Sequence, residues 1–264
     1  MPRFKLTLEY AGTRYSGWQI QKNARTVQGE LDRAIRTVTT RSKFELYGSG
    51  RTDAGVHALA QVAHLDIATA LPPHTLLMRL NDELPSDINL LRIDKAHHKF
   101  HARHSAVARG YLYQVARRRT AFAKPYVWWV RDPLDVKAMR EAAAHCLGLH
   151  DFQSFTDDDP EEKSTKVLLE RLEIDESDSS IGQGGLLIVR ISGSHFVWKM
   201  VRRLVGVIVA VGRGEVSQQA MRSFLSQKSD VPAKLTAPAS GLFLEWVRYD
   251  GEAEPPPHPP VISI

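Results

Sequence analysis

The sequence predicts an α+β protein made of two ferredoxin-like (βαββαβ) halves, with mainly antiparallel sheets and a cleft between the halves. Short segments of alternating apolar residues, typical of strands, are separated by segments in which apolar residues recur at helical spacing. The same order of elements occurs twice along the chain, which favours two α+β units. No sequence repeat relates the halves, so only the pattern is duplicated. A cleft between two such units is a natural place for a binding site.

The first half is expected to cover residues 1–105. Segments with the apolar pattern of strands are Phe4–Tyr10, Phe44–Tyr47, Ala60–Ile67 and Ile88–Ile93. A helix is expected after Thr26, because Thr26 can act as the N-cap and apolar residues follow at helical spacing. A second helix should begin at Pro72 and Pro73 and end at Pro85, since proline is tolerated in the first turn of a helix but not in its interior.

The second half is expected to cover residues 106–250 and to repeat this order. Its expected strands are Gly110–Ala116, Val167–Ile174, Leu186–Ser192 and Leu242–Tyr249. Its expected helices are Asp135–Leu147, Lys199–Val211 and a short helix after Ser217. The polar and glycine-containing segment Asp175–Gly185 should connect the two middle strands. Residues 251–264 are rich in proline, and we expect them to form a disordered tail.

The composition is ordinary for a soluble globular protein, with 43% hydrophobic and 25% charged residues. Cys146 is the only cysteine, which excludes an intramolecular disulfide and a cysteine metal cluster. The sequence has no signal-type apolar segment at its start and no apolar run long enough to span a membrane, so we expect a cytoplasmic protein with no membrane partner. A net charge of +5 suits a polyanionic partner without requiring one.

The segment Gly48–Ala58 has the composition of a tight, shaped loop. It contains three glycines, the carboxylate of Asp53 and the guanidinium of Arg51. If the segment is extended, Arg51 and Asp53 leave it on the same face and can pair. A free Asp, with a pKa of about 3.9, is already ionised at neutral pH, so Arg51 would serve to keep Asp53 charged and oriented inside a pocket. The alternative interpretation is a structural ion pair that closes a hairpin.

Basic residues gather near the start of the expected helix Lys199–Val211. Lys199, Arg202 and Arg203 fall within one turn, and the apolar residues of this helix indicate that the three cations point outward. A helix N-terminus with nearby cations can form a phosphate-binding site. The alternative interpretation is that these cations lie on an ordinary solvated face of the helix. Arg14, in a glycine-punctuated loop, adds basic character elsewhere.

Further clusters do not support a chemical role. His97, His98, His101 and His104 lie close in sequence, but no carboxylate or cysteine completes a ligand spacing, so we expect no metal. The consecutive acidic residues at 157–162 indicate a solvated loop. The glycines at 182–185 lack the Lys-Ser/Thr of a phosphate-binding loop and indicate a hairpin turn.

The nine residues Gly50-Arg51-Thr52-Asp53-Ala54-Gly55-Val56-His57-Ala58 resemble the catalytic signature of the TruA family of tRNA pseudouridine synthases. The resemblance spans nearly the whole folded chain. It includes Gly12-Thr13, Gly17-Trp18-Gln19, Thr26-Val27-Gln28, Phe100 to Ala106, Arg109-Gly110-Tyr111, Gly148 to Phe155, Met200-Val201-Arg202, Val205-Gly206, Thr236 to Ala239 and Gly241-Leu242. The departures are Ala11, His104 and Ser194, where the family often has Asp, Phe and Asn.

The resemblance implies an isomerase that converts uridine to pseudouridine in the anticodon stem-loop of tRNA, at positions 38, 39 and 40. It implies a homodimer that binds tRNA and needs no cofactor. Asp53 would be the essential carboxylate, which attacks the sugar or the base or removes a sugar proton. Arg51 would pair with Asp53, and Tyr111, otherwise a core tyrosine, would stack on the uracil. The residues expected to bind the substrate are Tyr111, Arg14, Lys199, Arg202 and Arg203.

Two other classes of protein fit some of these features. A non-catalytic RNA-binding protein could present the sheets of ferredoxin-like halves to RNA. A glycoside hydrolase would need two carboxylates on either side of the bond, and the loop around Asp53 offers one.

Overall fold

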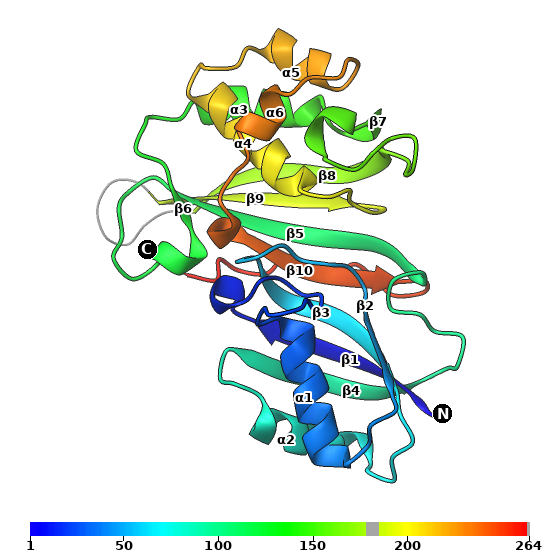
Figure 1. Ribbon diagram of the computed structural model, residues 1–264. Coiled ribbons are helices and arrows are strands. Elements are labelled where there is room, and N and C mark those ends of the chain that lie inside the picture. The colour runs from blue at the N-terminus through cyan, green and yellow to red at the C-terminus, as the bar shows by residue number, and fades with distance from the viewer. Residues whose placement is uncertain (178–184, 263–264) are drawn as a thin grey trace. The chain divides into compact units, whose positions relative to one another are not determined.

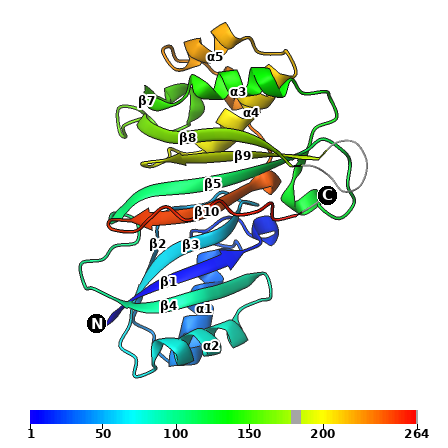
Figure 2. The same ribbon diagram turned by 180° about the vertical axis from the view of Figure 1, so that it is seen from behind.

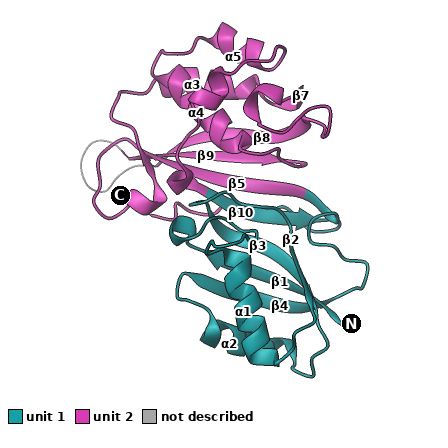
Figure 3. Cartoon of the chain, viewed as in Figure 1, with its two compact units in different colours: residues 1–107, 243–255 teal, residues 108–242, 256–264 magenta. Residues whose placement is uncertain are grey.

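The computed structural model describes residues 1–177 and 185–262 (Figure 1). The chain divides into two compact units (Figure 3). Unit 1 consists of Met1–Val107 and Phe243–Pro255, and unit 2 consists of Ala108–Leu242 and Pro256–Ile264. The first boundary lies close to the expected one after residue 105, but the last strand is placed differently. None of the helices within the described ranges is both long and apolar enough to cross a membrane.

Unit 1 is a sheet with two α-helices. Its elements are β1 (Arg3–Tyr10), the 3-10 helix η1 (Gly12–Arg14), α1 (Val27–Thr39), β2 (Glu45–Gly48), β3 (His57–Asp66), α2 (Pro73–Glu83), β4 (Ile88–Ala96) and β10 (Leu242–Tyr249). The strand order is β4-β1-β3-β10, with β2 also paired to β3. All pairs are antiparallel except β10 with β3. Figures 1 and 2 show α1 and α2 on the same face of this sheet.

The sequence of unit 1 explains its local structure. Strand β1 alternates buried and partly exposed residues, and its buried side chains are Phe4, Leu6, Leu8 and Tyr10. Helix α1 begins as expected, because the Thr26 hydroxyl accepts a hydrogen bond from the backbone N–H of Gly29 at 3.2 Å. Its apolar stripe buries Val27, Leu31, Ala34 and Ile35.

Strand β3 pairs with different neighbours at its two ends. Its last residues, Ala63–Asp66, pair with β2, whereas His57 and Ala58 at its start pair with β10. The loop between β2 and β3 therefore leaves the sheet near the point where β3 changes partner. This loop, residues 49–56, carries Asp53 and is called the Asp53 loop below.

Unit 2 also consists of strands and helices. Its strands are β5 (Ala106–Ala116), β6 (Trp128–Trp129), β7 (Gly148–Asp151), β8 (Lys166–Ser177) and β9 (Leu186–Gly193). Its α-helices are α3 (Val136–Ala144), α4 (Met200–Gly212), α5 (Gln218–Phe224) and α6 (Val231–Lys234), with short 3-10 helices at Lys124–Tyr126, Gln153–Phe155 and Ala239–Gly241. Figure 2 shows the order β5-β9-β8-β7, in which every pair is antiparallel. Strand β6 pairs in parallel with β5.

Helix α4 is the most deeply buried helix of the described part of unit 2. Every residue of it except Arg202 is buried. Gly206 makes this packing possible, because a Cβ there would lie 1.7 Å from the carbonyl oxygen of Leu235. The chain after α6 also bonds to the helix, since the Ala237 N–H donates to the Arg202 carbonyl at 3.0 Å.

The α+β class with mainly antiparallel sheets is confirmed, and the order βαββαβ describes residues 1–107. The strand Leu242–Tyr249 exists, but from Phe243 onward it belongs to unit 1 and not to the second half. The physical reason is that a strand joins whichever sheet edge offers it hydrogen bonds, regardless of its neighbours in the chain.

The expected connection Asp175–Gly185 differs in part, because β8 continues to Ser177. Residues 178–184, which include most of the expected glycine turn, lie outside the described residues. The proline-rich segment has no helix or strand over 251–262. It nevertheless contacts unit 2, because the Val261 N–H donates to the Gln114 side chain at 2.7 Å and Arg190 donates to the His258 carbonyl at 2.6 Å.

Candidate active site

The Asp53 loop is anchored to β3 and turns sharply. The Ser49 N–H donates to the Val62 carbonyl at 2.7 Å, and the Val56 N–H donates to the Asp53 carbonyl at 3.1 Å. Gly55 has a φ of 78°, which permits this turn. Within the loop, the side chain of Thr52 is buried and Asp53 is partly buried. The carboxylate is therefore carried by a loop of defined shape.

The segment Gly12–Trp18 packs directly against the Asp53 loop. The Gly55 N–H donates to the Tyr15 carbonyl at 3.2 Å, and the Trp18 N–H donates to the Thr52 carbonyl at 3.1 Å. Gly17 has a φ of 90°, and a Cβ there would lie 2.5 Å from the Thr52 carbonyl oxygen. The two loops approach so closely that a side chain at this glycine would push them apart.

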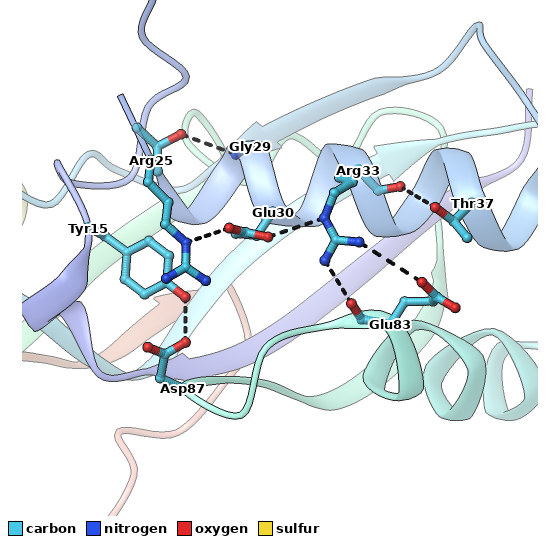
Figure 4. A network of polar contacts seen from close by, with 9 residues as sticks. Tyr15, Arg25, Gly29, Glu30, Arg33, Thr37, Glu83 and Asp87 are labelled. Atoms are coloured by element: carbon cyan, nitrogen blue, oxygen red, sulfur yellow. Dashed lines mark hydrogen bonds and ion pairs between the residues drawn. The ribbon is translucent and has the colours of Figure 1, made fainter. Parts of the chain in front are cut away.

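A polar network holds this segment in place (Figure 4). The buried Tyr15 donates its hydroxyl hydrogen bond to the Asp87 carboxylate, and the Arg25 guanidinium lies 4.8 Å from the centre of the Tyr15 ring. Arg25 pairs with Glu30 at 2.6 Å, and Glu30 pairs with Arg33 at 3.3 Å, so the network continues along α1. Burial and the bond to Asp87 raise the pKa of Tyr15 well above its usual value. Tyr15 therefore serves as a neutral donor that fastens the segment.

The two candidate cations of unit 1 do not form the ion pair that the sequence suggested. Arg14 and Arg51 are exposed, and among the described residues neither side chain has a hydrogen bond or an ion pair. The expected pair between Arg51 and Asp53 is therefore not formed. An exposed ion pair is worth only about 0–1 kcal/mol, so hydration of the guanidinium can compete with it. Two uncompensated cations accordingly lie on the two loops that meet beside Asp53.

Tyr111 lies in unit 2 on strand β5, opposite Ile191 of β9. It is partly buried, and its ring lies 5.0 Å from that of Phe196 at an angle of 83°. The segment that carries Phe196 also holds His195, whose pKa is lowered by burial and by the nearby charge of Arg109. The edge-to-face contact with Phe196 favours one orientation of the Tyr111 ring. Sequence reasoning did not single out Phe196, because it lies after an expected strand and no local pattern marks its contact with Tyr111.

The basic residues of α4 do not all point outward, which corrects the prediction. Arg203 is buried, with its side chain 4% exposed, and it donates to the Asp157 carboxylate. Lys199 pairs with the other oxygen of Asp157 at 2.9 Å. The Nε of Arg202 donates to the Ala237 carbonyl at 2.8 Å. The sequence pattern failed here because a buried arginine is tolerated when a carboxylate accompanies it, and the partner lies 46 residues away.

The acidic segment after Thr156 is likewise not simply solvated. Asp158 accepts a hydrogen bond from the Trp198 N–H at 2.9 Å and pairs with Lys163 at 2.6 Å. Together, Asp157 and Asp158 place negative charge at the beginning of α4, where the helix dipole favours it. The carboxylates of Asp157 and Asp158 therefore lie where the sequence predicted a phosphate-binding site.

The histidines near residue 100 make local contacts. The Nδ1 atom of His101 accepts from the backbone N–H of Arg103 at 3.2 Å, and the ring of His101 lies 4.3 Å from that of His104. Throughout residues 1–177 and 185–262, no three His, Cys, Asp or Glu side chains gather so that they could hold a metal ion.

Comparisons with known proteins identify the family. A family model described as tRNA pseudouridine synthase matches residues 7–105 and 142–250. The chain belongs to the tRNA pseudouridine synthase family. It is 36% identical to tRNA pseudouridine synthase A 2 of Bacillus cereus, over 94% of this chain and 100% of that protein. It is 39% identical to tRNA pseudouridine synthase A of Nitrobacter hamburgensis, with the same coverage of both chains. The corresponding protein of Maridesulfovibrio salexigens is also 39% identical, over 94% of this chain and 91% of that protein.

The matched ranges of this tRNA pseudouridine synthase family member include Asp53, Arg51 and Arg14 in unit 1 and the start of α4 in unit 2. Tyr111 lies between the matched ranges. Sequence reasoning missed Asp157, which holds Lys199 and Arg203, because neighbouring acidic residues suggested only a solvated loop. It also missed the contact of Tyr15 with Asp87, which no local pattern signals.

Replacing Gly17 with Ala should lower the free energy of unfolding by more than the cost of a positive φ at a non-glycine residue, because the new side chain would also press on the Asp53 loop. Gly214 also has a positive φ, of 74°, but nothing lies within 4 Å of a Cβ added there, so Gly214→Ala is the matched control. We expect the left-handed backbone conformation to lower the free energy of unfolding of both variants by about 1–2 kcal/mol. In Gly17→Ala, the steric clash with the Thr52 carbonyl should lower the free energy of unfolding by about a further 1–3 kcal/mol. Urea unfolding measures both losses, and equal losses would contradict the close approach of the two loops.

Replacing Asp157 with Asn should destabilise unit 2 in a pH-dependent way. The hydrogen bond from Lys199, together with that from Arg203, lowers the pKa of the Asp157 carboxyl group. Such a group stabilises the fold above its unfolded pKa, about 3.9, and this effect disappears as the pH falls through the lower folded pKa. The expected loss at neutral pH is about 1 kcal/mol, because the carboxylate is 37% exposed.

Urea unfolding of the native protein and Asp157→Asn, from neutral pH down to about pH 3, measures this difference. The difference in the free energy of unfolding should be constant above the unfolded pKa of Asp157 and should become smaller below it. Asp159→Asn is the control, because Asp159 lies in the same segment and forms no ion pair with any residue of the described ranges. A difference that stays unchanged at low pH would contradict a stabilising contribution from the ionised Asp157 carboxylate.

Proposed function

We propose that the protein converts uridine to pseudouridine at positions 38, 39 and 40 of the anticodon stem-loop of tRNA, with Asp53 as the essential catalytic carboxylate. Membership of the tRNA pseudouridine synthase family supports the reaction and the tRNA substrate. The observation that carries the residue assignment is the setting of Asp53. It is a partly buried carboxylate on a loop that backbone hydrogen bonds fix to β3 and to the segment Gly12–Trp18.

The reaction needs a positioned carboxylate more than it needs a helper molecule. The bond between uracil N1 and ribose C1′ breaks, a bond between uracil C5 and C1′ forms, and the C5 proton is lost while N1 gains one. Substrate and product are isomers, so no electrons are supplied or removed. A carboxylate can act on the sugar or the base as a nucleophile, or remove a sugar proton as a base. Either role requires that Asp53 be held at the reacting atoms, which the anchored loop favours.

The target nucleotide must leave its stack, at a free-energy cost of a few kcal/mol. We propose that Tyr111 stacks on the extruded uracil, since base stacking on an aromatic ring contributes about 1–3 kcal/mol. The near-perpendicular contact with Phe196 supports this role, because it favours one orientation of the Tyr111 ring. Arg51 would occupy the space that the extruded base leaves. Its exposed guanidinium, which forms no ion pair with any described residue, is available for that role.

We propose phosphate contacts for Arg14, Lys199 and Arg202. The placement of charge supports Arg14 most directly, because Lys199 is paired with Asp157 and would have to exchange that partner for a phosphate. Arg14 is exposed on η1, whose following residue bonds to the Asp53 loop. Lys199 and Arg202 lie at the start of α4 on the side that is not fully buried. For Arg203 we propose a structural role instead, because its guanidinium is buried against Asp157. Backbone recognition of a stem suits such cations better than reading of base edges.

We further propose, from the family resemblance, that the protein acts as a cytoplasmic homodimer that binds tRNA. Size-exclusion chromatography with light scattering tests the oligomeric state directly. A monomer at micromolar concentration would contradict the dimer while leaving the reaction untouched.

Replacing Asp53 with Asn should abolish pseudouridine formation without preventing tRNA binding. Asn keeps the shape of Asp but cannot act as a base or nucleophile, so we expect a fall of at least about 100-fold in rate. Mass spectrometry of digested tRNA measures pseudouridine, and filter binding measures affinity, which should change by less than a few fold. Asp82→Asn, at an exposed position of α2, is the control.

The outcome separates the alternative classes of protein. Retained activity in Asp53→Asn would remove Asp53 from the mechanism. A native protein that binds tRNA but forms no pseudouridine would be a non-catalytic RNA-binding protein, and release of free uracil would indicate a glycoside hydrolase.

Replacing Arg14 with Ala should weaken tRNA binding and reduce its salt dependence. Each lost phosphate contact lowers the slope of log affinity against log salt by about 0.7–0.9. Arg92→Ala is the control, because Arg92 is also exposed but is paired with Asp94 at 2.6 Å. Binding titrations over a range of salt concentrations measure the slope. Equal slopes for Arg14→Ala and the native protein would assign Arg14 to an ordinary solvated surface.

A further inference from the structure

Buried polar side chains form a connected group directly beneath the Asp53 loop. The Thr52 hydroxyl lies 2.8 Å from the Tyr10 hydroxyl. The Gln61 side-chain amide donates to the Gly50 carbonyl at 3.1 Å and lies 3.4 Å from the Tyr10 hydroxyl, and its oxygen accepts from the Ser49 hydroxyl at 2.7 Å. All the side chains in this group are at least 93% buried: Tyr10, Ser49, Thr52 and Gln61.

The group joins the loop to rigid elements at three points. Tyr10 lies at the end of β1 and Gln61 lies within β3, so both come from central strands of the unit 1 sheet. Their partners, Ser49, Gly50 and Thr52, are consecutive or nearly consecutive in the loop. A loop tied to two strands through side chains has less freedom than one held only at its ends.

An irregularity in strand pairing brings the two strand residues together. The register of β1 and β3 shifts between Leu8 and Tyr10, so that Leu8 pairs with Gln61 and Tyr10 pairs with Ala58. Such a bulge changes the direction of a side chain and is common next to active sites. Here it occurs at the end of β1 that meets the Asp53 loop.

We infer that Tyr10 and Gln61 are positioning residues for the Asp53 carboxylate. This inference rests on the proposed function. Thr52 directly precedes Asp53, and its hydroxyl is directed inward to Tyr10, which fixes the peptide that joins the two loop residues. Gln61 fixes the preceding residues in the same way. Because misplacement of a reacting group by about 1 Å can reduce a rate about 100-fold, a small shift of this loop would affect the reaction strongly.

A purely structural role is the alternative, and a second buried tyrosine of unit 1 separates the two. Tyr249 is 5% exposed, compared with 4% for Tyr10, and its hydroxyl donates to the Ala102 carbonyl at 2.8 Å. Tyr249→Phe therefore removes a similar buried hydroxyl group, whose hydrogen bond goes to the carbonyl of Ala102, outside the Asp53 loop. Tyr10→Phe keeps the ring that packs 6.2 Å from the Trp18 ring and removes only the hydroxyl.

The experiment compares Tyr10→Phe, Tyr249→Phe, Asp53→Asn and the native protein. It measures single-turnover pseudouridine formation, tRNA affinity, urea unfolding, and hydrogen exchange of peptides that cover residues 49–56. We expect similar stability losses in the two Phe variants and tRNA affinities within about three-fold of native. Tyr10→Phe alone should react at least about 10-fold more slowly and exchange faster in the loop.

Equal rates in the two Phe variants would overturn the inference while leaving the proposed function intact. An inactive native protein, or an active Asp53→Asn, would instead overturn the proposed function, and the inference with it. Thr52→Val provides a second test if Tyr10→Phe does not fold, because it removes the other partner of the same hydrogen bond. It should slow the reaction as Tyr10→Phe does. The double variant should be no slower than either single variant, and fully multiplicative effects would also overturn the inference.

Discussion

The hydrogen bond between the hydroxyl groups of Tyr10 and Thr52, inside unit 1, ties the loop that carries Asp53 to the first strand of the sheet. A buried hydroxyl without a partner destabilises the fold by about 1–3 kcal/mol, so this contact restricts where the loop can lie. Gln61 extends the same restriction to Ser49 and Gly50. The position of the carboxylate thus follows from the need to pair polar groups below it, as well as from the backbone of the loop itself.

A second restriction comes from the segment Gly12–Trp18, which covers the loop from another side. Backbone hydrogen bonds to Thr52 and Gly55 replace the ladder bonds that an irregular loop lacks. Close approach requires Gly17, and Tyr15 secures the segment through Asp87. Loops that carry functional groups are often held by a rigid scaffold, and the scaffold of the Asp53 loop includes a second loop.

The cations expected to bind phosphate are compensated differently in the two units. In unit 2, Asp157 neutralises Lys199 and Arg203, which keeps a buried arginine compatible with the core. In unit 1, Arg14 and Arg51 remain exposed without an ion pair to any described residue. A cation that the protein leaves uncompensated is available to an anionic ligand, whereas one already bound to a carboxylate must first exchange partners. This difference supports our proposal that Arg14, and not Arg203, contacts RNA phosphates.

Sequence by itself determined the family and most local elements of the fold, although it did not predict β7 or α6. Thr26 marks the start of α1, alternation marks β1, and the nine residues around Asp53 carry the family resemblance, because each signal lies within one short segment. Only the tertiary structure decided which distant residues meet. The pairing of β10 with β3, the burial of Arg203 against Asp157 and the contact of Tyr10 with Thr52 all join residues far apart in the chain. Such contacts depend on the packing of whole elements, and no local spacing of residue types specifies them.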